Sequence, residues 1–311
     1  MNVPMPHLPP ALVPPEPRER HAVAMPDGAT VILRRHGNPD GPRVALSHGN
    51  GMAIEAYYPF WRLMLAAYDV ILFDTRNHGQ NPPDGAGNHT WDRFREDFEA
   101  VRGAIDRLFG AGPVAAVFHS MSGISALLQT RAYGERWSPL ILIDPPIFPP
   151  PGHDLQRTQS FHMEDMEAIA LRRPDRFDDP EDLAAVLRKR PAFRRWPPGA
   201  HELFALATTR RTEDGWTLAC PKRLEAQVFA ANIDPTVWPT VGTMPGDIAV
   251  VGADASLPEV QPPALLGRAL AEEHGLPYTM IADCTHFLQI ERPEAVWQAV
   301  EAFLRRFGRA A

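Results

Sequence analysis

The feature that most constrains the fold of this chain is an alternation of short apolar runs with longer amphipathic segments. Eight runs have the length and composition of β-strands: AVAM, TVILRR, RVALSHG, DVILFD, PVAAVFHS, PLILID, DIAVVGA and YTMIADC. Later runs are separated or followed by segments with apolar residues at every third or fourth position, such as AYYPFWRLMLAAY, WDRFREDFEAVRGAIDRLFG and PEAVWQAVEAFLRRF. Parallel strands need helical crossovers of this kind. We therefore expect an α/β fold with a mostly parallel eight-stranded sheet and helices on both faces.

Two parts of the chain depart from this alternation. Only Pro26-Asp27-Gly28 separates the first two runs, and so short a turn favours an antiparallel hairpin. Between the sixth and seventh runs lies a long segment with many prolines and several short helical patterns. Because a structureless loop of that length is unusual in a compact domain, we expect a helical cap over residues 148–245, inserted after the sixth strand. The core would then comprise residues 21–147 and 246–311.

Composition argues against several classes of partner. The 38 acidic and 31 basic residues are interspersed and give a net charge of -7, so neither nucleic acid nor a membrane surface is an expected partner. No apolar run approaches the roughly 20 residues needed to cross a bilayer. Residues 1–20 lack a signal-peptide pattern, and their prolines favour a flexible polyproline-like tail. Cys220 and Cys284 have neither metal-ligand nor redox spacing, so we expect free, buried thiols in a soluble cytoplasmic protein.

Three of the predicted strands are followed by residues suited to nucleophilic catalysis. Ser120 follows the fifth run in FHSMSG, Asp144 closes the sixth in LILID, and His286 follows the eighth in CTHF. In an open parallel sheet, ligands bind beyond the carboxyl ends of the strands, so these residues should converge on one crevice. A serine hydroxyl is a poor nucleophile unless a base takes its proton, and His286 is the best candidate for that base.

Four motifs make the chain similar to the α/β-hydrolase fold family: SHGNG after the third run, DTRNHGQN after the fourth, FHSMSG, and CTHFLQIERPEAV before the last helix. The order Ser120, Asp144, His286 is also the family's order. The resemblance covers everything except the tail and the cap. It implies a serine hydrolase in which the backbone N–H groups of Asn50 and Met121 form the oxyanion hole. HGN also occurs in the haloalkane-dehalogenase branch, but that branch uses an aspartate nucleophile, so Ser120 argues against dehalogenation.

The chain departs from the family pattern at the elbow and at the acid. The usual elbow is G-x-S-x-G, because strand and helix approach closely there, and this chain has Phe118 and Ser122 in place of the two glycines. Many members carry the acid after the seventh strand, where this chain has Ala255 at the expected position and Asp254 one residue earlier. We favour Asp144 at the end of the sixth strand and keep Asp254 as the alternative acid.

The other polar motifs have simpler interpretations. His119, beside the nucleophile, is expected to be a packed structural histidine, and His48 and His78 should support the two HG turns. His162 and Glu164 in FHMED lack a third ligand in suitable spacing, so a metal site is not expected. Dinucleotide, phosphate-loop and zinc-protease fingerprints are missing from the sequence, so no cofactor is expected either.

Our leading hypothesis is a serine hydrolase that cleaves an ester, lactone or thioester of an apolar small molecule through an acyl-enzyme on Ser120. The cap would cover the pocket and line it with apolar side chains. One alternative is a carbon–carbon bond hydrolase that uses the same three residues. Another is a non-catalytic, hydrolase-like ligand-binding protein, which the departures at Phe118 and Ala255 motivate. Turnover of activated esters would separate the enzyme from the binding protein.

Overall fold

The computed structural model describes residues 8–84, 88–231, 235–258, 261–309 and 311. Its main element is an eight-stranded sheet in the order β1-β2-β4-β3-β5-β6-β10-β11, so each of the eight predicted runs is a strand. The strands are β1 (Glu19–Ala24), β2 (Thr30–Gly37), β3 (Arg43–Ser47), β4 (Asp69–Phe73), β5 (Ala115–His119), β6 (Leu140–Ile143), β10 (Ile248–Gly252) and β11 (Tyr278–Met280). β2 pairs antiparallel with β1 and β4, and all other neighbours are parallel, which confirms the mostly parallel sheet.

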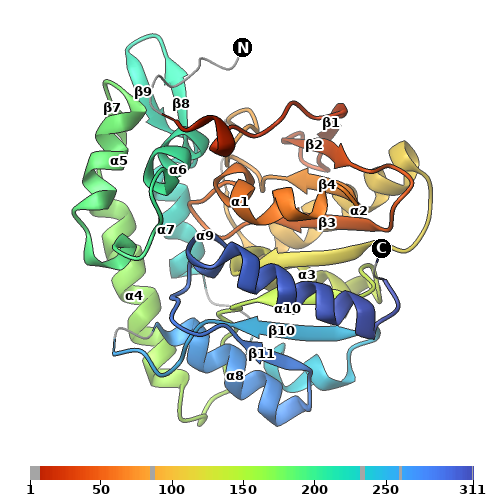
Figure 1. Ribbon diagram of the computed structural model, residues 1–311. Coiled ribbons are helices and arrows are strands. Elements are labelled where there is room, and N and C mark those ends of the chain that lie inside the picture. Colours follow the sequence, from red (N-terminus) through yellow and green to blue (C-terminus); the bar gives the residue numbers. More distant parts are fainter. Residues whose placement is uncertain (1–7, 85–87, 232–234, 259–260, 310) are drawn as a thin grey trace.

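Helices cover both faces of this sheet, as the sequence predicts (Figure 1). Alternate residues of a strand point to opposite faces, so β5 contributes Val117 to one buried cluster and Phe118 to the other. The helices α1 (Tyr58–Trp61), α9 (Leu288–Glu291) and α10 (Pro293–Arg306) contribute to the first cluster, and α2 (Trp91–Phe109), α3 (Met121–Tyr133) and α8 (Pro262–His274) contribute to the second. The sheet therefore has a hydrophobic core on each side.

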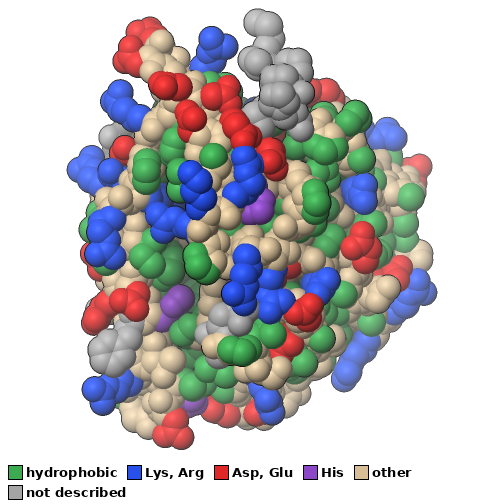
Figure 2. Space-filling model, turned by 60° about the vertical axis from the view of Figure 1, so that its left-hand side comes forward, with side chains coloured by type: hydrophobic (Ala, Val, Ile, Leu, Met, Phe, Trp, Pro, Cys, Tyr) green, Lys and Arg blue, Asp and Glu red, His purple; other side chains and the backbone are tan. Residues whose placement is uncertain are grey.

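The elements from α4 to α7 lie at the carboxyl ends of the strands, on the left in Figure 1. They are α4 (Gln156–Arg172), β7 (Arg176–Phe177), α5 (Pro180–Arg188), α6 (Ala200–Thr208), β8 (Thr209–Thr212), β9 (Gly215–Leu218) and α7 (Lys222–Ala230), with the 3-10 helix η4 (Pro191–Phe193). The 3-10 helix η5 (Trp238–Thr243) lies elsewhere, against the end of α8, since a Cβ at Gly242 would lie 2.9 Å from His274 Nδ1. We call residues 148–245 the cap segment, and its bounds as a domain stay a prediction. Figure 2 brings this side forward and shows acidic and basic side chains interspersed on it.

The cap segment contains the helices that the sequence predicts and also a small antiparallel sheet, which the sequence analysis did not predict. Its order is β7-β9-β8, and β8 and β9 form a hairpin in which Arg211 pairs with Trp216. The turn Glu213-Asp214 precedes Gly215, whose φ of +120° is a conformation that L-residues other than glycine rarely adopt. Strands of two to four residues carry too little periodicity to be recognised in a sequence.

The predicted tail over residues 1–20 extends too far at its carboxyl end, because Glu19 and Arg20 belong to β1. Residues 1–7 lie outside the described part of the chain, Pro10–Leu12 form the 3-10 helix η1, and β1 begins at Glu19. Glu19 lies opposite Arg35 of β2 and accepts a hydrogen bond of 2.8 Å from its guanidinium. Backbone pairing with β2 therefore orders the end of this segment.

Two smaller observations complete the fold. Both cysteines, Cys220 and Cys284, are free and buried, as expected. Among the helices that the structure describes, none has the length and apolar character needed to cross a membrane.

Candidate active site

Ser120 lies at a sharp turn between strand β5 and helix α3. Its backbone has φ +53° and ψ -118°, which is a strained conformation for a residue with a side chain. The turn is tied to the neighbouring strand, because the Ser120 N–H donates to the carbonyl oxygen of Ile143 at 2.9 Å. The helix lies close to the sheet at Gly123, where a Cβ would lie 3.2 Å from Leu142 Cδ2 and 3.3 Å from the Phe118 carbonyl oxygen. The glycine that this elbow needs is thus at position 123, and Ser122 is tolerated.

Phe118 does not obstruct this turn, because its ring is fully buried in the core beneath α2 and α3. The ring packs edge-to-face against Phe73, Phe98 and Trp137, with centroid distances of 5.8, 5.3 and 5.0 Å. Such aromatic pairs are favourable beyond the area that they bury. The departure from glycine at this position is therefore accommodated by an aromatic cluster that has room for the ring.

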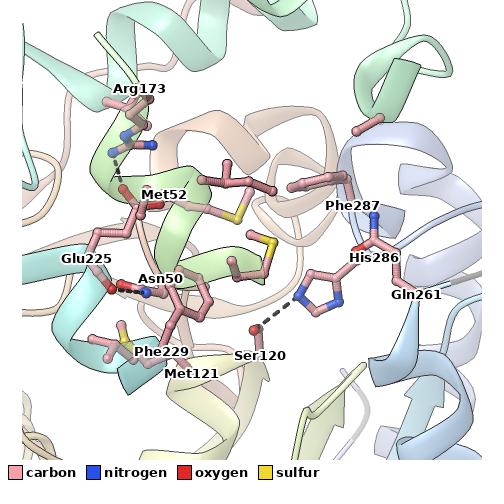
Figure 3. Close-up of a pocket in the computed structure, with 18 of the residues that line it drawn as sticks. Asn50, Met52, Ser120, Met121, Arg173, Glu225, Phe229, Gln261, His286 and Phe287 are labelled. Atoms are coloured by element: carbon pink, nitrogen blue, oxygen red, sulfur yellow. Dashed lines mark hydrogen bonds and ion pairs between the residues drawn. The ribbon is translucent and has the colours of Figure 1, made fainter. Parts of the chain in front are cut away.

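The structure brings Ser120, His286 and Asp144 together in one hydrogen-bonded chain. Figure 3 shows its first part, the hydrogen bond between Ser120 and His286. His286 Nε2 lies 3.1 Å from Ser120 Oγ, and His286 Nδ1 lies 2.7 Å from Asp144 Oδ2. Since a carboxylate only accepts, the Nδ1–H donates to Asp144 and leaves the Nε2 lone pair facing the Ser120 hydroxyl. The second carboxylate oxygen of Asp144, which is fully buried, accepts from the Ala253 N–H at 3.0 Å. This arrangement fixes the tautomer that a general base needs.

Asp254, the alternative acid, has different partners. Its carboxylate accepts from the Ser256 N–H at 2.9 Å, the Ser256 hydroxyl at 2.6 Å and the Asp283 N–H at 2.8 Å. The Ser256 hydroxyl and these backbone groups lower the pKa of Asp254. The side chain thus closes a turn and ties β10 to the segment before His286, whereas Asp144 contacts the imidazole itself.

His119 is hydrogen-bonded to the main chain of His286. Its Nε2–H donates to the carbonyl oxygen of His286 at 2.9 Å, and its Nδ1 accepts from the Tyr57 hydroxyl at 2.6 Å. Burial, followed by the neighbouring His286, holds the pKa of His119 well below its usual range, so this ring is neutral. Tyr57 was not found by sequence reasoning, because no motif marks it.

His48 and His78 hold the turns in which they lie. The His48 Nδ1–H donates to the Gly49 carbonyl at 2.7 Å, and its Nε2 accepts from the Thr75 N–H at 3.1 Å. The Nε2 of His78 accepts from the Gly51 N–H at 3.0 Å. Burial lowers the pKa of both rings, which suits neutral imidazoles that each donate and accept once.

The segment Gly49–Gly51 and the start of α3 present two backbone N–H groups beside Ser120. Within the part of the chain that the structure describes, no hydrogen bond takes up the backbone N–H of Asn50 or of Met121. Gly49 allows close approach, since a Cβ there would lie 3.2 Å from Ser120 Cβ and 3.1 Å from His119 Nδ1. The two N–H groups that the sequence singles out are therefore available to an oxygen at Ser120.

A cavity of about 450 Å³ opens above Ser120 and is lined by both the core and the cap segment. Most of its wall is apolar and includes Met52, Trp91, Met163, Leu187, Phe204 and Phe229. His162 from α4 also lines it, and burial, followed by His286, lowers the pKa of His162 to about 4. A cavity of this size and composition suits a small, largely apolar ligand.

Two charged residues of the cavity wall were not predicted from the sequence. Arg173, next to the end of α4, forms an ion pair with Glu225 of α7 (Figure 3). Burial raises the pKa of Glu225, and Arg173 opposes this effect. The side-chain amide of Asn50 donates to the backbone carbonyl of the same glutamate at 2.9 Å.

Comparison of the chain with known proteins gives a consistent picture. The model of a family described as "Alpha/beta hydrolase family" matches residues 44–299. The curated relative "Probable oxidoreductase EphD" of Mycobacterium tuberculosis is 28% identical over 113 residues, which is 36% of this chain. The match spans only 19% of that relative's own length, so it does not carry over the activity of the whole relative.

Solved structures share the fold over nearly the whole chain. An E-2-(acetamidomethylene)succinate hydrolase has a TM-score of 0.76 at 17% identity, covering 92% of this chain and 99% of its own. The thioesterase domain from the curacin biosynthetic pathway has a TM-score of 0.68 at 17% identity, covering 91% and 98%. A structure from a study of carboxylesterases of Nitrososphaera gargenis has a TM-score of 0.69 at 15% identity, covering 93% and 99%. At these identities, the likeness is one of fold.

Proposed function

Because this chain belongs to the α/β hydrolase family, we propose that it is a serine hydrolase that cleaves an ester, lactone or thioester bond of an apolar small molecule. The observation that carries the proposal is the hydrogen-bonded chain from Ser120 through His286 to Asp144 at the floor of a largely apolar cavity. The named solved relatives include a thioesterase domain and a carboxylesterase study, which is consistent with this bond class.

In the acylation half-reaction, Ser120 Oγ attacks the carbonyl carbon of the substrate while His286 Nε2 takes the hydroxyl proton. The carbonyl oxygen becomes an oxyanion, which accepts from the backbone N–H groups of Asn50 and Met121. Met121 is the first residue of α3, so the positive end of the helix dipole adds to this stabilisation. Asp144 stabilises the imidazolium. The bond to the leaving group then breaks as His286 returns the proton to the leaving oxygen or sulfur, and the acyl group stays on Ser120.

In the deacylation half-reaction, water replaces the serine hydroxyl as the nucleophile. His286 Nε2 takes a proton from the water as its oxygen attacks the acyl carbon, and a second oxyanion forms at the same two N–H groups. When this intermediate collapses, the ester bond to Ser120 Oγ breaks and His286 returns the proton to that oxygen. The products are the free acid and the unmodified enzyme.

The cavity supports the ester-type reaction over carbon–carbon cleavage. A carbon–carbon hydrolase of ring-fission products would need cationic or polar groups free to hold a second carboxylate. Arg173 and Arg190 both line the cavity, but Arg173 is already paired with Glu225 and Arg190 is exposed to solvent, where water screens its charge. Apolar side chains dominate the remaining wall, and these suit an uncharged acyl or alcohol group.

The direct test is intact mass after incubation with a fluorophosphonate. The parent should gain one adduct, Ser120→Ala should gain none, and His286→Ala should react far more slowly because its serine has no base. Ser122→Ala is the matched control, since the Ser122 hydroxyl donates to the His119 carbonyl at 2.8 Å and takes no part in the proposed reaction. Turnover of p-nitrophenyl esters by the parent and by Ser122→Ala would then separate an enzyme from a binding protein. A correctly folded parent without adduct or turnover would refute the proposal.

A further inference from the structure

The cap segment contacts the oxyanion loop, which we define as residues 49–51, through one residue of α7. The side-chain amide of Asn50 donates to the Glu225 backbone carbonyl at 2.9 Å. Gly51 has φ +70°, and a Cβ at this position would lie only 2.5 Å from Glu225 Oε1. On the core side, the Gly51 N–H donates to His78 Nε2 at 3.0 Å. The loop is thus held between a histidine of the core and a glutamate of the cap segment.

Glu225 is an unusual residue to find in this place, because it is a buried carboxylate beside the site where negative charge would develop. The residue is 6% exposed, and the proposed reaction does not use it. Opposite charges attract and like charges repel strongly where water is excluded, so an unpaired Glu225 anion would disfavour an oxyanion at the Asn50 N–H. The guanidinium of Arg173 compensates this charge from the end of α4.

The neutralised pair also joins two separate helices of the cap segment over the cavity. Arg173 follows the last residue of α4, Glu225 lies within α7, and both line the cavity. α7 is further tied to the core, since the His89 N–H donates to Gln227 Oε1 at 3.1 Å and the Trp91 indole donates to the Ala231 carbonyl at 3.2 Å. Glu225 is therefore held in a fixed place against the loop, and the guanidinium of Arg173 compensates the negative charge of its carboxylate.

We infer that Glu225 and Arg173 are positioning residues of the cap segment: Glu225 holds the oxyanion loop against the core, and Arg173 keeps the Glu225 charge from opposing the oxyanion. This inference rests on the proposed function, because it assigns the loop to oxyanion stabilisation. Neither residue contacts the reacting atoms. Their effect should appear in the stabilisation of a tetrahedral anion and should leave ground-state binding nearly unchanged.

The test compares Arg173→Gln, Glu225→Gln and the double variant with the parent. Arg188→Gln combined with Glu202→Gln is the matched control, because it removes an ion pair between α5 and α6 whose residues do not line the cavity. The readouts are kcat and KM on a p-nitrophenyl ester and the Ki of phenylboronic acid. In the boronate complex, Ser120 Oγ bonds to boron and the hydroxyl proton passes to His286, which leaves a tetrahedral anion at the oxyanion loop.

At alkaline pH, where the unpaired Glu225 carboxyl stays ionised although burial raises its pKa, Arg173→Gln should lower kcat and weaken boronate binding by about tenfold, because one oxyanion donor is worth about 10²–10³ and here it is displaced rather than removed. The double variant should return to within about threefold of the parent, since two amides leave no uncompensated charge and the backbone acceptor of Asn50 remains. KM should change less than the boronate Ki in both. Equal boronate Ki values in Arg173→Gln, the control and the parent would overturn the inference, as would a double variant that is worse than Arg173→Gln.

Hydrogen exchange of a peptide covering the oxyanion loop gives a readout that does not need turnover. Exchange should be faster in Arg173→Gln than in the control pair at equal global stability, as measured by urea unfolding. Unchanged loop exchange would overturn the positioning even in an active enzyme. A parent without fluorophosphonate adduct would instead refute the proposed function, so the two failures are distinguishable.

Discussion

Replacing Asp144 with asparagine is the substitution that discriminates best between the two acids that the sequence allows. Asp144 Oδ2 lies 2.7 Å from His286 Nδ1, and its other oxygen accepts from the Ala253 N–H at 3.0 Å. Asparagine has nearly the same volume, so it fits the fully buried site. Its amide oxygen can keep one of these hydrogen bonds. If that oxygen stays on the Ala253 N–H, the NH2 group faces His286 and favours the imidazole tautomer with the proton on Nε2.

The size of the effect follows from this change of tautomer. An Nε2–H cannot accept the proton of Ser120, so the base is lost although the ring stays in place. The corresponding loss in serine hydrolases of this mechanism is about 10⁴ in kcat. At about 1.4 kcal/mol for each factor of ten, this is about 5 kcal/mol of transition-state stabilisation. The nucleophile itself is retained, so slow labelling by a fluorophosphonate should remain.

Asp254→Asn is the matched control, since it makes the same chemical change at the end of the neighbouring strand. Asp254 bonds Ser256 and the Asp283 N–H and has no contact with the imidazole, so kcat/KM should stay within about threefold of the parent. Circular dichroism and urea unfolding would verify that both variants fold. The reasoning would be refuted by a greater loss of kcat in Asp254→Asn than in Asp144→Asn, or by an Asp144→Asn variant that keeps a tenth of the parent's kcat.

Two further predictions concern stability. Phe118→Gly restores the family's usual elbow residue but empties the space among Phe73, Phe98 and Trp137. It should therefore lower the free energy of unfolding in urea by about 3–5 kcal/mol. A variant as stable as the parent would show that the aromatic cluster does not stabilise the core. Burial, followed by Arg34, lowers the pKa of His36 from 6.5 to about 4, so the unfolded chain takes up this proton first and stability falls as the pH drops from 6.5 towards 4. His36→Gln should reduce this fall in the free energy of unfolding by up to about 1.4 kcal/mol per pH unit. If the free energy of unfolding in urea depends on pH as steeply in the variant as in the parent, the prediction is wrong.

Much of the fold could be predicted because its signals are local. The central strands of the large sheet, β3 to β6 and β10, consist mainly of short apolar runs, and a parallel sheet buried on both faces needs such runs. Ser120 and His286 could be singled out for a related reason, since both directly follow a strand and the carboxyl ends of parallel strands meet at one edge. The acid could only be ranked, because Asp144 and Asp254 both lie at that edge and the sequence does not reveal which carboxylate reaches the imidazole.

The contacts that escaped prediction join residues far apart in the chain. Asn50 and Glu225 are 175 positions apart, and no periodicity or motif links them. Arg173 sits just beyond the end of a helix, where a basic residue usually faces solvent, so only the fold reveals its buried partner. The strands of the cap segment were not predicted because they are too short to show a sequence pattern: β7 has only two residues, and β8 and β9 have only four each.

The three hydrogen-bonded residues and the oxyanion loop are held by different parts of the chain. Ser120, His286 and Asp144 are fixed by strand ends within the core, so changes in the cap segment should leave their mutual distances intact. The oxyanion loop, in contrast, is bonded to the core through His48 and His78 and to the cap segment through Glu225. A substitution in α7 or at Arg173 that alters the shape of the cavity would therefore also alter the loop that stabilises the transition state. If the proposed function holds, we therefore expect selection of the substrate and the rate of the chemical step to be coupled through α7.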